Sequence, residues 1–138
     1  MERVRSNTAV LILIALLSIL IFQACGDSEI GLRGEGVRPN DDGEITVVLR
    51  NFAFEPDTLV FEVGQTVEFT LSSSDSLHSF TVRDLDINWV VKGKDEPITE
   101  SFVFSRPGKF KLICAIPGHQ ASRMVGTVEV MPKGGSVQ

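Results

Sequence analysis

Four residues of this chain have the side chains of one soft-metal site, and three of them lie close together in the sequence. Cys114, His119 and Met124 follow the spacing Cys-x4-His-x4-Met, and His78 is the only other histidine. Two imidazoles and a thiolate in one plane, with a weak axial thioether, form a mononuclear copper site. The four residues therefore predict a site for one copper ion per chain, which would alternate between Cu(I) and Cu(II).

Other interpretations of these residues explain less of the pattern. Zinc is the main alternative metal, because a cysteine, two histidines and a water form a plausible catalytic zinc site. That interpretation leaves Met124 without a role, whereas thiolate and thioether ligands favour copper. Core packing alone would suit a single histidine or methionine, but it does not account for the spacing of the whole set. Asp75 and the serines near it lack the Gly-x-Ser-x-Gly motif of a hydrolase, so we interpret them as a polar turn.

The elements that must position these residues are short strands. Apolar residues alternate with polar ones in runs that end at Gly64, at Pro107-Gly108 and at Pro117-Gly118. This pattern predicts an all-β fold, an antiparallel Greek-key β-sandwich. We expect strands over residues 44–50, 58–63, 66–71, 78–83, 88–91, 98–104, 109–114 and 126–131.

The same alternation predicts where the donor side chains point. Cys114 has the parity of Phe110 and Leu112, so it should face inward at the end of its strand. His78 has the parity of Phe80, so it should face inward at the start of its own strand. The loop that follows Cys114 can then bring the other two donors to the same end of the sandwich.

The first residues have the pattern of an export signal. Residues 1–25 combine two early arginines with an apolar run over 9–22. That run is shorter than the roughly 20 residues of a membrane span, so it favours a signal peptide. Cys25 follows Ala24 and resembles the lipidated cysteine of a bacterial lipobox, and the alternative is an uncleaved membrane anchor. Both interpretations place the rest of the chain outside the cytoplasm, tethered at the periplasmic or extracellular face of the membrane.

The rest of the chain divides by composition. Residues 26–43 are polar and rich in Gly, Asp and Glu, which predicts a flexible linker. Residues 44–132 are enough for one domain with a core that needs no disulfide, and 133–138 form a C-terminal tail. We expect Cys25 and Cys114 to have separate roles, because pairing them would consume the thiol that the metal site requires.

From residue 54 to residue 131 the chain resembles the cupredoxins, the family of blue copper proteins. Phe54-Glu-Pro56 and residues 59–64 resemble the opening strands of that family, and the segment 107–119 with Met124 is the most specific part. The Cys-x4-His-x4-Met spacing is similar to that of auracyanin and rusticyanin, whereas azurin and plastocyanin use shorter versions. The resemblance implies electron transfer and no catalysis.

The resemblance also implies roles for individual residues. His78, Cys114 and His119 would be equatorial ligands and Met124 the axial one. Ser79 matches a position whose side chain often ties the two ligand loops together by hydrogen bonds.

Other residues support or depart from this resemblance. Pro117 would stiffen the ligand loop, and Gly118 would permit a tight backbone approach before His119. Leu77 replaces the glycine of azurin, which argues against a fifth, carbonyl ligand. Residues 72–80 look more like subunit II of cytochrome oxidase, but the binuclear copper centre of that family needs two cysteines in the ligand loop. This loop has one.

The charge and the ligand loop suggest what the protein contacts. A net charge of −5 argues against nucleic-acid binding. The loop is apolar around its histidine, and its one charged residue is Arg123. This favours brief docking of a redox protein such as a cytochrome, an oxidase or a reductase. Alternatively, the apolar residues only exclude water from the metal. We expect the protein to dock as a monomer. The alternative to electron transfer is copper trafficking, in which the protein would bind copper and hand it over. The candidate docking residues are Ala115, Ile116, Pro117, Ala121 and Val125.

Overall fold

The computed structural model describes residues 36–134, which form nine strands and one turn of 3-10 helix. The elements are β1 (Glu44–Arg50), β2 (Ala53–Glu55), β3 (Thr58–Glu62), β4 (Thr66–Ser73), β5 (His78–Val82), η1 (Arg83–Leu85), β6 (Ile87–Val91), β7 (Ile98–Val103), β8 (Gly108–Ile113) and β9 (Val125–Met131). No helix in this part of the chain is long and apolar enough to cross a membrane. The predicted leader with Cys25, the first part of the predicted linker and residues 135–138 lie outside the described residues.

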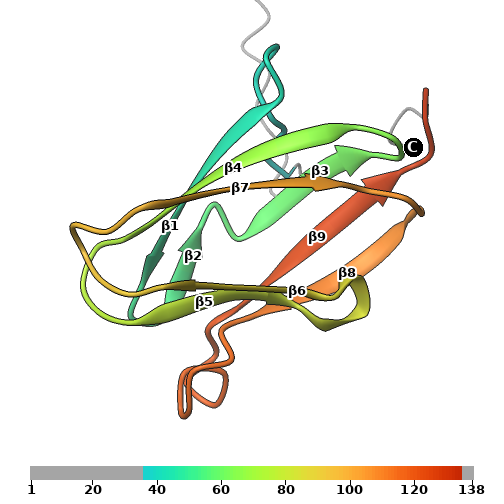
Figure 1. Cartoon of the computed structure of the whole chain (residues 1–138). Coiled ribbons are helices and arrows are strands. Elements are labelled where there is room, and N and C mark those ends of the chain that lie inside the picture. The colour runs from blue at the N-terminus through green and yellow to red at the C-terminus, as the bar shows by residue number, and fades with distance from the viewer. Residues whose placement is uncertain (1–35, 135–138) are drawn as a thin grey trace, which may run out of the picture. The chain divides into compact units, whose positions relative to one another are not determined.

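The strands form two sheets that pack as a sandwich (Figure 1). One sheet has the order β2-β1-β4-β7 and the other has the order β3-β9-β8-β5-β6, which confirms the predicted all-β sandwich. The pairing is not antiparallel throughout, because β1 runs parallel to β4 and β3 runs parallel to β9. Side chains alternate in the same way in parallel and antiparallel strands, so the sequence pattern could not reveal the direction of these two pairs.

The structure adds a strand that the sequence pattern did not predict. β2 has only three residues, which is too short for an alternating pattern to be recognised. Its central residue, Phe54, is buried and lies edge-on to Phe80, with ring centroids 6.1 Å apart. β2 pairs with β1 and thereby fixes the tight connection at residues 51–52.

The described end of the predicted linker contacts the domain. Val37 N donates to Thr58 O at 2.9 Å, and Val60 N donates to Val37 O at 2.9 Å. Asn40 Oδ1 accepts a hydrogen bond of 2.8 Å from the N–H of Glu44, the first residue of β1. These bonds hold residues 37–40 against β3 and the start of β1. The bounds 26–43 of the flexible linker stay a prediction.

Phenylalanine rings fill the space between the two sheets. Phe61 of β3 stacks on Phe104 with centroids 4.4 Å apart, and Phe69 of β4 contacts Phe61, Phe80 and Phe104. Burying each such side chain contributes roughly 1.5–3 kcal/mol to folding, and close packing of this kind resists deformation. The core therefore gives the strand ends a rigid base.

All five residues of β5 are buried, although the strand alternates between apolar and polar side chains. Phe80 and Val82 belong to the core, whereas Ser79 and Thr81 are buried polar residues. Buried hydroxyl groups need hydrogen-bond partners, and the partners of these two lead to the metal centre.

Candidate metal centre

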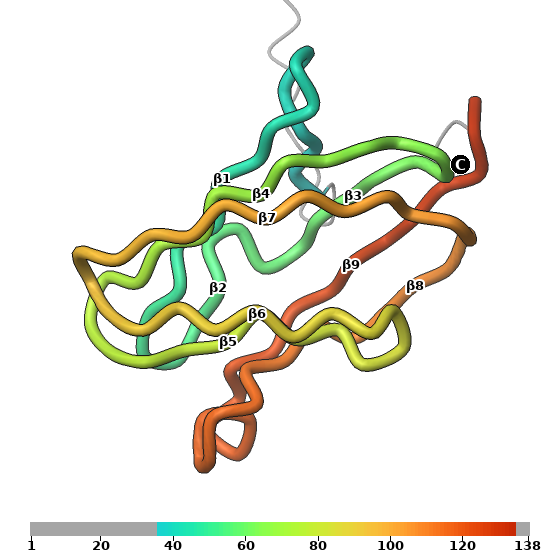
Figure 2. Tube along the Cα trace, in the orientation of Figure 1, coloured from blue at the N-terminus to red at the C-terminus, as the bar shows by residue number. Residues whose placement is uncertain are grey.

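Three donors come to the same end of one sheet. His78 is the first residue of β5, Cys114 follows the last residue of β8, and Met124 precedes the first residue of β9. β8 lies between β5 and β9 and runs antiparallel to both, so its end meets their beginnings. The loop over residues 114–124 extends beyond the strand ends (Figure 2) and also carries His119.

A tight turn aims His119. His119 N donates to Ile116 O at 3.1 Å, which closes a four-residue turn with Pro117 and Gly118 in the middle. Gly118 has a φ of 87°, a conformation that glycine adopts without strain, and proline favours the position before it. The Pro-Gly pair thus produces the turn directly before the second imidazole.

Backbone hydrogen bonds close the rest of the ligand loop. Met124 N donates to His119 O at 3.0 Å, and Cys114 N donates to Met124 O at 3.2 Å. These two bonds hold the three donor residues of the loop in register with one another. Met124 is fully buried, which suits both an axial thioether ligand and a core residue.

The three equatorial donor atoms form a compact triangle. The Nδ1 atoms of His78 and His119 are 3.2 Å apart, and they lie 4.0 Å and 3.5 Å from Cys114 Sγ. A metal about 2.0–2.1 Å from nitrogen and about 2.3 Å from sulfur needs trigonal donors about 3.5–3.8 Å apart. The triangle therefore fits one metal ion.

The chemistry of the donors identifies the metal that fits. Two imidazoles, one thiolate and one thioether make up the ligand set of type 1 copper. His78, Cys114 and Met124 are fully buried, and His119 is half-buried. The site therefore fits one type 1 copper ion, and four protein donors leave no position of the kind that a catalytic zinc keeps open for water.

Asp75 orients the first imidazole. His78 Nε2 donates to Asp75 Oδ1 at 2.6 Å, which leaves Nδ1 free to face Cys114. Partial burial raises the pKa of Asp75, but hydrogen bonds from His78 and from the backbone of Asn51 and Ser76 outweigh burial and lower the pKa to about 2. Asp75 does lie in a polar turn, but sequence reasoning missed its contact with the imidazole. Its position three residues before His78 was the available signal.

Ser79 connects the two segments that carry the ligands. Ser79 N donates to Cys114 Sγ at 3.3 Å, and Ser79 Oγ accepts a hydrogen bond of 2.8 Å from Ala115 N. A backbone hydrogen bond to the sulfur stabilises the thiolate form, which is the form that binds metal. These two hydrogen bonds therefore join the start of β5 to the end of β8, and one of them ends on the Cys114 sulfur.

Several apolar residues of the ligand loop are at least partly exposed, and His119 is half-buried among them in the sequence. In the ligand loop Ala115, Pro117 and Ala121 are exposed, Val125 is 38% exposed and Ile116 is half-buried. The structure adds Phe52 and Leu77, which sequence reasoning missed and which are 45% and 42% exposed. The Phe52 ring lies edge-on to His119, with centroids 5.1 Å apart. No sequence signal marked Phe52, because its place depends on the unpredicted strand β2.

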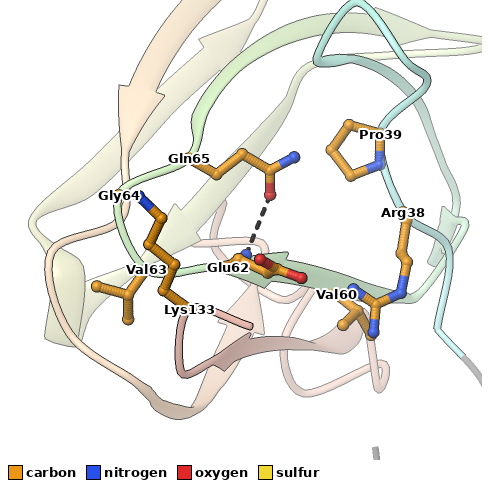
Figure 3. Close-up of a pocket in the computed structure, with 8 residues that line it drawn as sticks. All are labelled: Arg38, Pro39, Val60, Glu62, Val63, Gly64, Gln65 and Lys133. Atoms are coloured by element: carbon orange, nitrogen blue, oxygen red, sulfur yellow. Dashed lines mark hydrogen bonds between the residues drawn. The ribbon is translucent and has the colours of Figure 1, made fainter. Parts of the chain in front are cut away.

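A hollow at the other end of β9 contains charged side chains and none of the four metal donors. It is lined by Arg38, Pro39, Val60, Glu62, Val63, Gly64, Gln65 and Lys133 (Figure 3). Gln65 Oε1 accepts a hydrogen bond from Glu62 N at 3.0 Å, a local contact of the turn between β3 and β4. Glu62 pairs with Met131, so this hollow lies away from the ligand end of the sheet.

Comparison with known proteins places the fold. No family model matches the chain. Cytochrome c oxidase subunit 2 of Thermus thermophilus is 34% identical over 92 residues, which are 63% of this chain and 66% of that protein. For a second cytochrome c oxidase subunit 2 from the same species the matched part is 53% of the protein, so the chain spans about half to two thirds of these curated relatives.

Two solved structures have similar folds. The reduced auracyanin of Roseiflexus castenholzii has a TM-score of 0.55 at 19% identity, covering 65% of this chain and 98% of that protein. The metal-binding domain of the Cu(I)-exporting P-type ATPase CopA of Streptococcus pneumoniae has a TM-score of 0.56 at 17% identity. The match covers 70% of this chain and 96% of that chain. The domain has the cupredoxin fold. The resemblance that the sequence predicted is thereby confirmed, and this cupredoxin domain has a His, Cys, His and Met site at one pole.

Proposed function

We propose that this cupredoxin domain carries single electrons between redox proteins. The observation that supports this most directly is the convergence of His78, Cys114 and His119, whose donor atoms all lie within 4.8 Å of one another. A bound copper ion supplies the one-electron couple Cu(II)/Cu(I). A reduced protein donor gives up the electron and an oxidised protein acceptor receives it, so the cycle moves no proton and breaks no covalent bond.

The way the ligands are held supports a carrier. Asp75 fixes the orientation of His78, backbone bonds fix the ligand loop, and the phenylalanine core lies beneath both. Because these supports belong to the protein and not to the metal, we expect the donors to keep similar positions in both oxidation states. Small rearrangement on gain or loss of an electron favours fast transfer.

A mononuclear site fits better than a binuclear or catalytic one. A binuclear centre of the kind considered above needs two cysteines in the ligand loop, and this loop contains only Cys114. Both histidines of the chain belong to this one site. No further histidine remains for a second copper or for proton transfer, so we propose a carrier and not an enzyme.

We propose that electrons enter and leave through the exposed edge of His119. The apolar residues around it, Phe52, Leu77, Ala115, Ile116, Pro117, Ala121 and Val125, would form the docking surface. Its occupant would be a redox protein, a cytochrome, an oxidase or a reductase, because a patch with few charges suits contacts that form and break quickly. We propose that one monomer docks at a time.

The domain would work outside the cytoplasm. The leader pattern of residues 1–25 supports export, and Cys25 would carry the lipid that tethers the chain to the membrane, or the same segment would serve as an uncleaved anchor. Cys25→Ser should abolish an acyl mass on residue 25. Mature protein that begins at Met1 without lipid would contradict the lipoprotein form of this proposal.

Copper trafficking is the second candidate function. It is favoured by the structural similarity to the metal-binding domain of a Cu(I)-exporting ATPase. The burial of His78, Cys114 and Met124 argues for retention, because a copper ion that is handed over needs exposed ligands.

Repeated redox cycling separates the two functions. The copper-loaded protein is reduced and reoxidised many times in the presence of an excess of a Cu(I) chelator, and the bound copper is measured after each cycle. A carrier keeps its copper while the electron exchanges. Loss of copper to the chelator at a rate comparable to electron exchange would favour trafficking.

A further inference from the structure

The Cys114 sulfur has a buried hydroxyl group beside it. Ser79 is 1% exposed, and its Oγ lies 4.0 Å from Cys114 Sγ. Ser79 already donates its backbone N–H to the same sulfur at 3.3 Å. Whether the hydroxyl adds a second hydrogen bond depends on the direction of its single proton.

Thr81 and Asn88, which lie further along the chain, determine the direction of that proton. Thr81 Oγ1 lies 2.9 Å from Ser79 Oγ, and Thr81 donates its own proton to Asn88 Oδ1 at 2.8 Å. A hydroxyl has one proton, so Thr81 can only accept from Ser79. The oxygen of Ser79 is meanwhile an acceptor for Ala115 N–H at 2.8 Å. The hydrogen bonds therefore run from Ser79 to Thr81 to Asn88, away from the sulfur.

We propose that Thr81 and Asn88 hold the Ser79 hydroxyl proton away from the Cys114 thiolate and thereby keep the reduction potential of the copper site low. This inference rests on the proposed copper site. A hydrogen bond to the thiolate draws electron density from the sulfur and weakens its donation to the metal, which Cu(II) needs more than Cu(I). Withholding the second bond therefore favours the oxidised form.

The three residues connect the ligand sulfur to the surface. Thr81 is 5% exposed, and its cross-strand partner Asn88 lies on the edge strand β6 with its side chain exposed. Asn88 borders a hollow that is also lined by Arg83, Asp86 and Ala115. Thr81 and Asn88 are thus positioning residues that act on the site through Ser79, without touching the metal.

A double-mutant cycle in the copper-loaded full chain tests the proposal. Thr81→Val keeps the shape of the side chain and removes the acceptor, which leaves Cys114 Sγ as the acceptor near the Ser79 hydroxyl. We expect an upward shift of the reduction potential and a change in the energy of the thiolate-to-copper band. Thr81→Ser keeps a hydroxyl and should restore both values to those of the wild type.

Ser79→Ala isolates the hydroxyl from the general effect of a more apolar environment. The effect of Thr81→Val should largely disappear when it is made in the Ser79→Ala background, because no hydroxyl is left to turn. An unchanged or lower potential in Thr81→Val, or an equal upward shift in both backgrounds, would overturn the proposal.

The metal-free full chain gives a readout that does not depend on copper. In its NMR spectrum, the buried Ser79 hydroxyl proton should show nuclear Overhauser contacts to the side chain of Thr81. Contacts to the β-protons of Cys114 instead would contradict the proposal. Failure of electron transfer with these contacts intact would count against the proposed function alone.

Discussion

The two segments that supply the ligands are built in different ways. The segment from Asp75 to Ser79 is held by side chains. The Asp75 carboxylate fixes the imidazole of His78, and the Ser79 hydroxyl is hydrogen-bonded to Thr81 Oγ1 and to the N–H of Ala115. The loop over residues 114–124 is held by backbone hydrogen bonds and a Pro-Gly turn, and its histidine reaches the surface. According to our proposals, the first segment would set the electronic properties of the site, and the second would provide the exit for the electron.

Replacement of each histidine by glycine should have the largest effect and should distinguish the two segments. Both variants should lose the copper spectrum, because each removes an equatorial ligand. Added imidazole should restore the spectrum of His119→Gly, since that side chain is half-buried, but not that of His78→Gly, since its site is fully buried. Optical titration with imidazole measures the difference. Equal rescue of both variants would contradict the contrast between the segments.

Met124→Leu should have the next largest effect. It removes a weak soft donor, which disfavours Cu(II) more than Cu(I), so the thiolate band should persist while the reduction potential rises. Each tenfold change in relative affinity corresponds to about 59 mV for one electron. Potentiometry of the variant checks this, and an unchanged spectrum and potential would mean that Met124 is only a core residue.

Asp75→Asn should have a moderate effect on the metal-free protein, and the effect should depend on pH. The folded-state pKa of Asp75 is lowered from 3.8 to about 2, so its contribution to stability is present above about pH 4 and is lost as the pH falls towards 2. Because the side chain is one third exposed, we expect about 1 kcal/mol or less. Urea unfolding of both proteins at pH 7 and pH 2.5 measures it, and an equal difference at both pH values would contradict the assignment.

Ala121→Asp should have the smallest effect on the site and a clear effect on exchange. Ala121 is exposed in the ligand loop and supplies no ligand. A carboxylate there should slow electron exchange with the native partner and lower the potential only slightly, with the copper spectrum nearly unchanged. Asp84→Asn, which changes an exposed charge in η1, serves as the control. Unchanged exchange rates in Ala121→Asp would place docking elsewhere.

The sequence predicted the features that depend on local patterns. Alternation gave the inward direction of Cys114 and His78, and both are fully buried. It did not give the parallel pairs, because strand direction leaves no trace in alternation. Sequence reasoning did not use the three-residue spacing of Asp75 and His78, which form a local contact. It also missed the contacts of Phe52 with His119 and of Asn88 with Thr81, because these join residues that belong to different strands or turns. Only the folded arrangement of those strands and turns reveals such contacts.

We conclude that the four donors bind one copper ion as a type 1 site. The most direct measurement combines the metal content, the optical spectrum and the EPR spectrum of the oxidised protein with those of Cys114→Ser. We predict one copper per chain and an intense visible thiolate-to-copper band that is absent in the variant. Stoichiometric zinc in the protein from its native source, with no coloured form after copper reconstitution, would contradict the assignment of a copper site.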